Sequence, residues 1–246
     1  MNIIPAIDLR DGQCVRLYQG DFEQQTNYPQ EPVELAQQYE SMGFKSLHIV
    51  DLDGARSGRQ QNQDIIREIV ESSKLAVQLG GGIRTESQIE SWFDCGLARV
   101  VIGSLAIAEP ARVRDWLAAY GPERIVLALD VNVTPAGVPH VATHGWRQAE
   151  DMTLWRSLED YKPAGVKHVL CTDISRDGAM TGPNLGLYKD LIGRYPDILL
   201  QASGGVRHID DLEALLKIGA QSAISGRALL DGKITAEEIA TFLPDA

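Results

Sequence analysis

The chain has 246 residues, of which 44% are hydrophobic and 23% are charged, and its formal net charge is −11 at pH 7. The acidic balance excludes nucleic acid and anionic membranes as general partners but allows a local anion site. No apolar run approaches the roughly 18 residues that cross a bilayer, and the first segment carries charge by Asp8 and Arg10. We therefore expect a cytoplasmic protein without a secretory segment.

Short apolar segments alternate with helical patterns along the whole chain. The predicted strands are residues 3–7, 46–50, 76–79, 99–102, 125–129, 166–171, 198–201 and 222–225, and the predicted helices are 32–42, 64–70, 86–93, 111–120, 154–161, 185–195, 209–218 and 236–242. Strands that are almost entirely apolar are typical of a parallel sheet covered on both faces. Eight such units, each of about 31 residues, predict a (β/α)8 TIM barrel. A doubly wound open sheet is the alternative, but it would not predict two equal halves.

Three longer loops follow predicted strands one, two and five, at the end of a barrel where active sites lie. Residues 12–28 are consistent with a small hairpin or lid, and residues 132–146 alternate like a hairpin over the mouth. Residues 52–63 are polar, and we expect a flexible loop there.

The sequence repeats itself at a spacing of 123 residues, half of its length. Adding 123 maps Gly81, Gly82, Gly96 and Gly103 onto Gly204, Gly205, Gly219 and Gly226, and Arg84 onto Arg207. We therefore predict one domain, residues 1–246, built from two homologous half-barrels of approximately residues 1–123 and 124–246.

Each half contains glycine turns of the kind that bind phosphate. Ser203-Gly204-Gly205 and Ser225-Gly226-Arg227 follow apolar segments, and we expect each to open a helix, where free N–H groups and the helix dipole favour an anion. Tight packing of strand on helix would also require glycine. We favour the phosphate clamp, because both halves repeat it and Arg84, Arg207 and Arg227 follow the turns.

Two aspartates are placed for proton transfer. Asp8 and Asp130 follow strands one and five, which lie opposite each other in an eight-stranded barrel, so the two carboxyl groups would face one ligand. Asp51 and Asp173 form a second repeated pair, for which we favour a structural role in turns. Asp177 adds a carboxylate in the sixth loop.

No pattern supports a metal site or a covalent nucleophile. The five histidines show no HExxH spacing, and Cys14, Cys95 and Cys171 form no CxxC motif, so we expect free thiols and no metal. His48 is open to two interpretations, a group in the barrel mouth or a satisfied interior histidine. Trp146, beside Gly145, suits stacking on a flat heterocycle.

Several motifs together resemble a known family. PAIDLRDGQCVRLYQGDF, LHIVDLDGA, QLGGGIR, VLCTDISRDGAMTGPN and SGGVRHIDDL are similar to the phosphoribosylformimino-5-aminoimidazole carboxamide ribotide isomerases of histidine biosynthesis, over almost the whole chain. The related cyclase subunit of imidazole glycerol phosphate synthase shares the paired aspartates and glycine turns. Its typical cysteine-leucine-aspartate first strand is absent here.

The resemblance implies an aldose–ketose isomerase that performs an Amadori rearrangement without any cofactor. Asp130 would be the general acid that opens the ribose, and Asp8 the general base that removes the C2 proton. Thr172 and Asp177 would contact the substrate near the reacting centre, and Arg16 and Trp146 would reorganise over it. The resemblance places the two phosphates of the substrate at Gly82, Gly103, Ser104, Gly205, Gly226 and Arg227.

Two other functions remain open from the sequence. The chain could be a dual-substrate isomerase that also accepts phosphoribosyl anthranilate, since such enzymes differ mainly in their loops. It could also be a catalytically silent scaffold that binds a bisphosphate, although intact Asp8 and Asp130 argue against this. We expect a small bisphosphorylated substrate, no nucleic acid or membrane partner, and a monomer.

Overall fold

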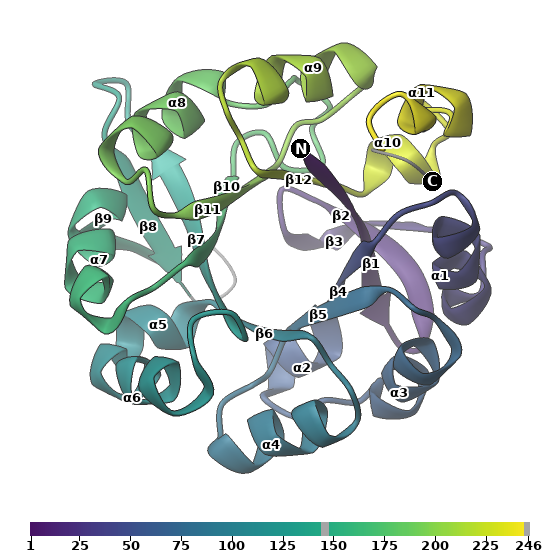
Figure 1. Ribbon diagram of the computed structural model, residues 1–246, viewed down its shortest axis with the longest axis horizontal. Helices are drawn as coiled ribbons and strands as arrows, with labels where there is room; N and C mark the ends of the chain where they lie inside the picture. The colour runs from purple at the N-terminus through teal and green to yellow at the C-terminus, as the bar shows by residue number, and fades with distance from the viewer. Residues whose placement is uncertain (144–147, 244–246) are drawn as a thin grey trace.

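The computed structural model describes residues 1–143 and 148–243, and within them eight parallel strands close into a ring (Figure 1). The ring runs β1, β4, β5, β6, β7, β10, β11, β12 and back to β1. These strands are β1 (Asn2–Arg10), β4 (Ser46–Asp51), β5 (Ala76–Gly80), β6 (Arg99–Ile102), β7 (Ile125–Val133), β10 (His168–Asp173), β11 (Leu199–Ser203) and β12 (Ser222–Ser225). The prediction of a (β/α)8 TIM barrel is confirmed.

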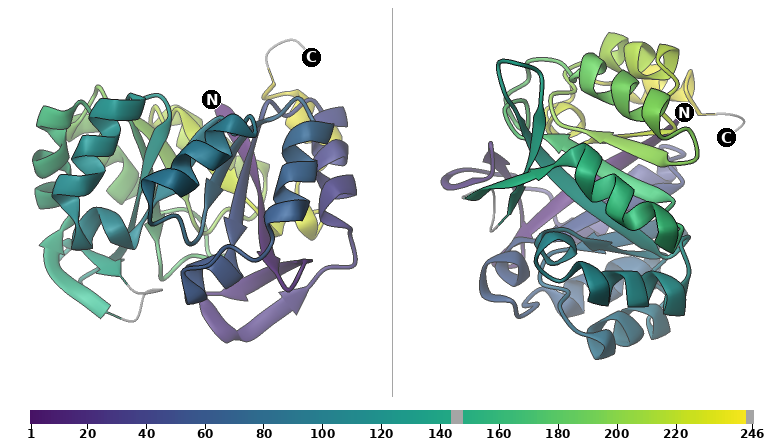
Figure 2. Two further views of the ribbon diagram at one scale, coloured as in Figure 1. Left: turned by 90° about the horizontal axis from the view of Figure 1, so that it is seen from below. Right: turned by 90° about the vertical axis from the view of Figure 1, so that its left-hand side faces the viewer.

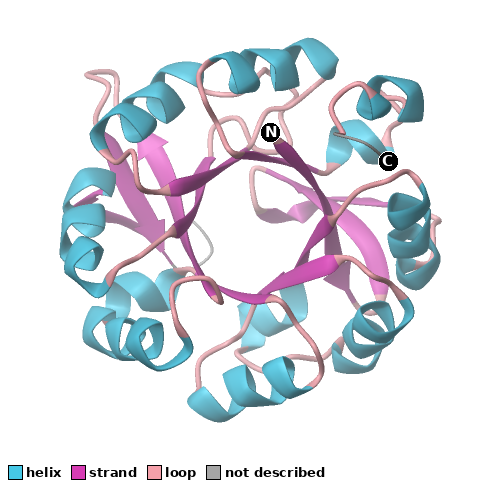
Figure 3. Ribbon diagram, viewed as in Figure 1, coloured by secondary structure: helices cyan, strands magenta, loops and turns pink. Residues whose placement is uncertain are grey.

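Helices surround the ring and pack their apolar faces on it (Figure 3). They are α1 (Pro32–Ser41), α3 (Gln63–Ser72), α4 (Glu86–Asp94), α6 (Pro110–Tyr120), α7 (Leu154–Tyr161), α8 (Leu185–Arg194), α9 (Ile209–Lys217) and α11 (Ala236–Ala240). Thr85 and Thr235 begin α4 and α11 with capping boxes completed by Gln88 and Glu238. Capping boxes of this kind satisfy N–H groups that have no partner within the first helical turn.

Two antiparallel hairpins extend from one end of the barrel, opposite the N-terminus (Figure 2). The first pairs β2 (Gln13–Tyr18) with β3 (Asp21–Asn27), and the second pairs β8 (Pro139–Thr143) with β9 (Gln148–Thr153). Because β1 pairs with β2 and β7 with β8, the strands β1 and β7 continue past Asp8 and Asp130. The sequence predicted that these two aspartates follow the ends of their strands. They lie within the strands instead.

The loop predicted as flexible, residues 52–63, contains a helix instead. Helix α2 (Leu52–Ser57) begins directly after β4, where the Asp51 side chain accepts a hydrogen bond from the backbone N–H of Gly54. Three further short helices are α5 (Ser104–Ala108), the 3-10 turn η1 (Lys162–Ala164) and α10 (Arg227–Leu230). A buried carboxylate cap thus orders a segment whose composition alone favoured a loop.

The inside of the ring is a small core of its own. Its buried apolar side chains are Ile4, Ala6, Val101, Val126, Leu170 and Ile224. Three buried polar side chains, His48, Gln78 and Gln201, also come from ring strands. The molecule therefore has an outer core between strands and helices, and an inner core that forms the floor of the barrel mouth.

Candidate active site

Asp8 lies in the barrel mouth and is paired with an arginine from the first hairpin. Arg16 Nη1 lies 2.8 Å from Asp8 Oδ2, and Arg16 Nη2 donates to the backbone oxygen of Ala6 at 2.6 Å. Burial raises the pKa of Asp8, while the Arg16 guanidinium acts in the opposite direction. The aspartate expected to be a base is therefore covered by the arginine expected to reorganise over the substrate.

Asp130 lies on β7 beside Thr172 of β10, which is its partner in the strand register. The charges of both Asp8 and Asp130 act on the carboxyl group of Asp177 and raise its pKa. All three carboxyl groups therefore lie near one another in the barrel mouth. Burial is the main reason that the pKa of Asp177 rises to about 7. A carboxyl group with this pKa can hold or release a proton near neutral pH.

The Gly81-Gly82 and Gly204-Gly205 turns are packed against neighbouring backbone. A Cβ atom on Gly82 would lie 2.6 Å from the carbonyl oxygen of Gly54, and one on Gly205 would lie 2.4 Å from that of Gly182. All four glycines have positive φ, which residues with side chains rarely adopt. Packing therefore requires glycine here in both halves, whether or not a phosphate binds.

These glycine pairs do not open helices directly, so that part of the sequence prediction is wrong. Three or more residues separate them from α4 and α9, which begin at Glu86 and Ile209. The direct helix starts belong to the other repeated pair. Gly103 precedes α5, whose first residue is Ser104, and Gly226 precedes α10, whose first residue is Arg227.

Asp51 and Asp173 have the structural role predicted for them. Asp51 accepts hydrogen bonds from the backbone of Gly54 and from Asn62 Nδ2 at 2.7 Å. Asp173 accepts from Ser175 and from Asn184 Nδ2 at 2.6 Å. Each buried carboxylate therefore fixes the loop that follows its strand.

The sequence reasoning missed two glutamines beneath the mouth. Gln78 on β5 and Gln201 on β11 exchange hydrogen bonds of 2.7 and 3.0 Å across the barrel, and Gln78 also contacts His48. They are 123 residues apart, and each lies three residues before a repeated glycine, Gly81 or Gly204. The repeat, extended by three residues toward the N-terminus from Gly81 and Gly204, would have found them.

The remaining site predictions have mixed outcomes. Trp146 lies outside the described residues. Arg227 bonds to the carbonyl oxygen of Gly178 at 2.8 Å and pairs with Asp231 on the next turn. Within the described part of the chain, no group of three or more His, Cys, Asp or Glu side chains is arranged to hold a metal ion. The three cysteines are free thiols, as predicted.

No described helix combines the length and apolar character that a membrane-spanning helix needs. What the mouth offers is three carboxyl groups, one guanidinium and two turns at short-helix N-termini. Such a set can move protons on a bound anionic ligand without further groups.

Comparison with known proteins places these residues in a family context. The family model described as "Histidine biosynthesis protein" matches residues 2–235. Proteins from Alteromonas mediterranea and Aeromonas salmonicida are 49% and 48% identical over 236 and 233 residues, which is 96% and 95% of this chain and 96% and 94% of theirs. A protein from Tolumonas auensis is 47% identical over 99% of this chain and 100% of its own. All three are named 1-(5-phosphoribosyl)-5-((5-phosphoribosylamino)methylideneamino)imidazole-4-carboxamide isomerase.

Proposed function

The chain belongs to the histidine biosynthesis protein family, and we propose that it is the aldose–ketose isomerase that its relatives' names describe. The substrate would be the bisphosphorylated aminoimidazole carboxamide compound, whose phosphoribosylamino group becomes the phosphoribulosyl form. The observation that carries this proposal is the pair Asp8 and Asp130, which share one mouth with Asp177 in a chain that matches those isomerases end to end.

The proposed reaction is an Amadori rearrangement by proton transfer. Asp130 donates a proton to the ring oxygen of the ribose, and the ring opens to a protonated Schiff base. Asp8 then removes the proton from C2, which gives an enolamine that tautomerises to the aminoketose. Proton transfers alone suffice, so the proposal includes no metal and no cofactor.

Asp8 needs to be uncovered before it can act. The Arg16 guanidinium, which is paired with this carboxylate, blocks the approach of a substrate from its side. We propose that Arg16 moves from Asp8 to the substrate on binding, and that Trp146 joins it from the fifth loop. Thr172 and Asp177 would then contact the substrate beside the reacting carbons.

The two phosphates would bind on opposite sides of the mouth. One would lie at Gly82, Gly103 and Ser104, and the other at Gly205, Gly226 and Arg227. The support for this placement is the repeat of 123 residues together with the helix starts at Ser104 and Arg227, since the positive end of a helix dipole favours an anion. We also propose that the protein acts as a monomer in the cytoplasm.

A turnover assay tests the proposed function. The chain should convert the bisphosphorylated aminoimidazole substrate, and full activity should remain after exhaustive chelation. Turnover of phosphoribosyl anthranilate in the same assay would establish the dual-substrate alternative. Binding of the substrate without turnover by the wild-type chain would support the silent scaffold and contradict our proposal.

A further inference from the structure

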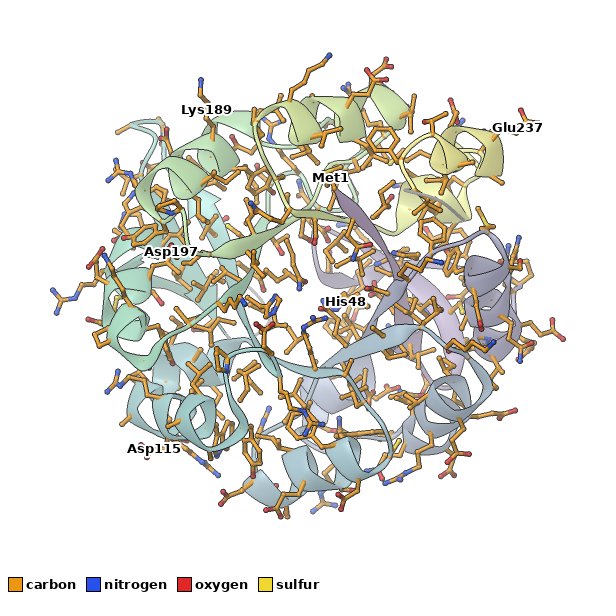
Figure 4. All side chains as sticks on the ribbon, viewed as in Figure 1. Met1, His48, Asp115, Lys189, Asp197 and Glu237 are labelled. Carbon is orange, nitrogen blue, oxygen red and sulfur yellow. The ribbon has the colours of Figure 1, made fainter. Side chains whose placement is uncertain are left out.

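Three buried polar side chains that contact one another lie among the apolar side chains of the inner core. His48, Gln78 and Gln201 are 7%, 1% and 3% exposed, and they come from β4, β5 and β11. Figure 4 shows His48 within the ring of strands. Burying polar groups there costs free energy unless each is satisfied by hydrogen bonds, so the trio calls for a functional or structural reason.

The hydrogen bonds within the trio determine which ring nitrogen of His48 carries a proton. Gln78 Nε2 lies 3.1 Å from His48 Nδ1 and 2.7 Å from Gln201 Oε1, while Gln201 Nε2 lies 3.0 Å from Gln78 Oε1. Gln78 presents its amide N–H to the ring, so in this arrangement Nδ1 accepts and the proton of a neutral imidazole is on Nε2. The Gln201 amide is coupled to this arrangement, since Gln78 can turn over only if Gln201 turns with it.

The surroundings keep this imidazole neutral. Burial lowers the pKa of His48 to about 3, and the Arg16 guanidinium acts in the same direction. The groups that act on the ring are the amide of Gln78 from β5, which contacts Nδ1, and the Arg16 guanidinium above β1. None of these described groups is a carboxylate that would favour an imidazolium.

His48 is also close to the level at which the chemistry is proposed to occur. Its partner in the strand register is Ala6, which lies two residues before Asp8 on β1. The Cα atom of His48 therefore lies about 7 Å deeper along the barrel than that of Asp8. Arg16 bonds both to Asp8 and to the carbonyl oxygen of Ala6, which places its guanidinium between the two levels. Within the described residues, Nε2 of His48 has no hydrogen-bond partner, and Arg16 is the group expected to leave when substrate binds.

We propose that Gln78 and Gln201 are positioning residues, and that they hold His48 as a neutral N–H donor to a hydroxyl group of the reacting pentose. This inference rests on the proposed isomerase function. A neutral donor suits a hydroxyl, whereas the phosphates are assigned to the turns at the rim. The donor would orient C2 of the sugar toward Asp8 without itself exchanging a proton.

The tautomer can be measured directly in the wild-type protein. Nitrogen NMR of imidazole-labelled protein should show Nδ1 unprotonated and Nε2 protonated for His48 from pH 5 to pH 8. A proton on Nδ1, or an imidazolium in that range, would overturn the proposal. This measurement does not depend on turnover, so it separates failure of this inference from failure of the proposed function.

Two variants test through catalysis whether Gln78 and Gln201 position His48. Gln78→Glu places an acceptor beside Nδ1 and should move the ring proton to it, while Gln201→Met frees Gln78 without touching His48. Each should lower kcat by about tenfold, which corresponds to one lost hydrogen bond, with a smaller change in KM. Wild-type kcat in both variants, or an unchanged His48 tautomer in Gln78→Glu, would contradict the proposed positioning of His48.

His168 provides a matched control inside the same barrel. It is a buried histidine on β10, and its Nε2 lies 2.9 Å from Glu123 Oε2. It is four residues before Thr172 on the same strand, and thus toward the opposite end of the barrel from the mouth. His168→Gln should lower thermal stability and leave kcat unchanged. An equal loss of kcat in His168→Gln would show that the glutamine variants act through general disruption of the barrel.

Discussion

The two halves of the barrel use the same contacts to hold their loops, but the contacts at the mouth of the barrel differ between them. Asp51 and Asp173 cap equivalent loops, and the glycine pairs at Gly81 and Gly204 pack against equivalent backbone. The helix-start glycines differ. A Cβ atom on Gly226 would lie 1.6 Å from Arg16 Nη2, whereas one on Gly103 would meet only the Ala128 side chain at 3.8 Å and its backbone oxygen at 3.9 Å.

This difference shows how a repeated scaffold can support an asymmetric reaction. Parts that hold loops in place are the same in both halves, because the same backbone geometry has to be stabilised twice. The asymmetry comes from the first hairpin, which lays Arg16 across Asp8 and against Gly226. A base and an acid need different surroundings, and the hairpins are where the halves can differ at little cost to the barrel.

The largest expected effect comes from removing either carboxylate. Asp8→Asn and Asp130→Asn should each lower kcat by roughly 10² to 10⁴, the usual effect of a lost base or acid, with substrate binding largely retained. If their roles differ as proposed, Asp8→Asn should remove the acid limb of the kcat/KM profile and Asp130→Asn the alkaline limb. Asp197→Asn, on the exposed surface, is the control. A variant with wild-type turnover would remove its residue from the mechanism.

The next largest effect should come from the two phosphates of the substrate. Removing either one should lower kcat as well as raise KM, because binding energy far from the bond changes helps to hold the reacting pentose. Loss of charge-assisted hydrogen bonds should reduce kcat/KM by roughly ten- to a hundredfold for each phosphate. Steady-state kinetics with both monophosphate analogues measures this.

Substrate analogues are a cleaner test of the two phosphate sites than changes at the glycine pairs. Gly82→Glu and Gly205→Glu would force side chains into the carbonyl oxygens of Gly54 and Gly182, so lost activity would not reveal lost phosphate binding. If one analogue matches the full substrate in kcat/KM, the turns of that half serve packing only.

Removing Arg16 should change the pH dependence of the reaction. The guanidinium favours the ionised form of Asp8, so Arg16→Met should raise the pKa of this carboxyl group further. Because a general base acts when ionised, the acid limb of kcat/KM should move to higher pH. Arg112→Met, whose ion pair with Glu109 is exposed, should leave the profile in place. An acid limb that stays where it is in Arg16→Met would show that Asp8 does not set it.

Much of the fold followed from sequence, because apolar periodicity and helix caps are local signals. The extensions of β1 and β7 did not, since residues such as Arg10 and Asn132 are polar and pair only within the hairpins. Helix α2 was missed because it depends on the side chain of Asp51 rather than on its own composition.

The candidate site likewise contains residues that the sequence predicted and contacts that it did not. The repeat and the family motifs pointed to Asp8, Asp130 and the glycine turns, all of which lie on barrel strands or directly after them. The contact of Arg16 with Asp8 and Gly226 depends on the path of a hairpin, which no local pattern encodes. Gln78 was overlooked because a single polar residue in an apolar strand has no periodicity to mark it.

The smallest expected effect separates the two helix-start glycines. Gly226 has φ −113° and ψ −79°, close to the α region, whereas Gly103 has φ −97° and ψ −106°, outside the regions that residues with side chains favour. Gly103→Ala meets neighbours only at ordinary contact distances, so backbone strain of about 1 to 3 kcal/mol should lower its stability while its pH profile stays unaltered. Gly226→Ala should lose less stability, because the clash is with a flexible side chain, but Arg16 would have to leave its position beside Asp8. Its acid limb should therefore move in the same direction as in Arg16→Met. If Gly103→Ala moved the limb as far as Gly226→Ala, the halves would be equivalent at the mouth, and Arg16 would not be the source of the asymmetry.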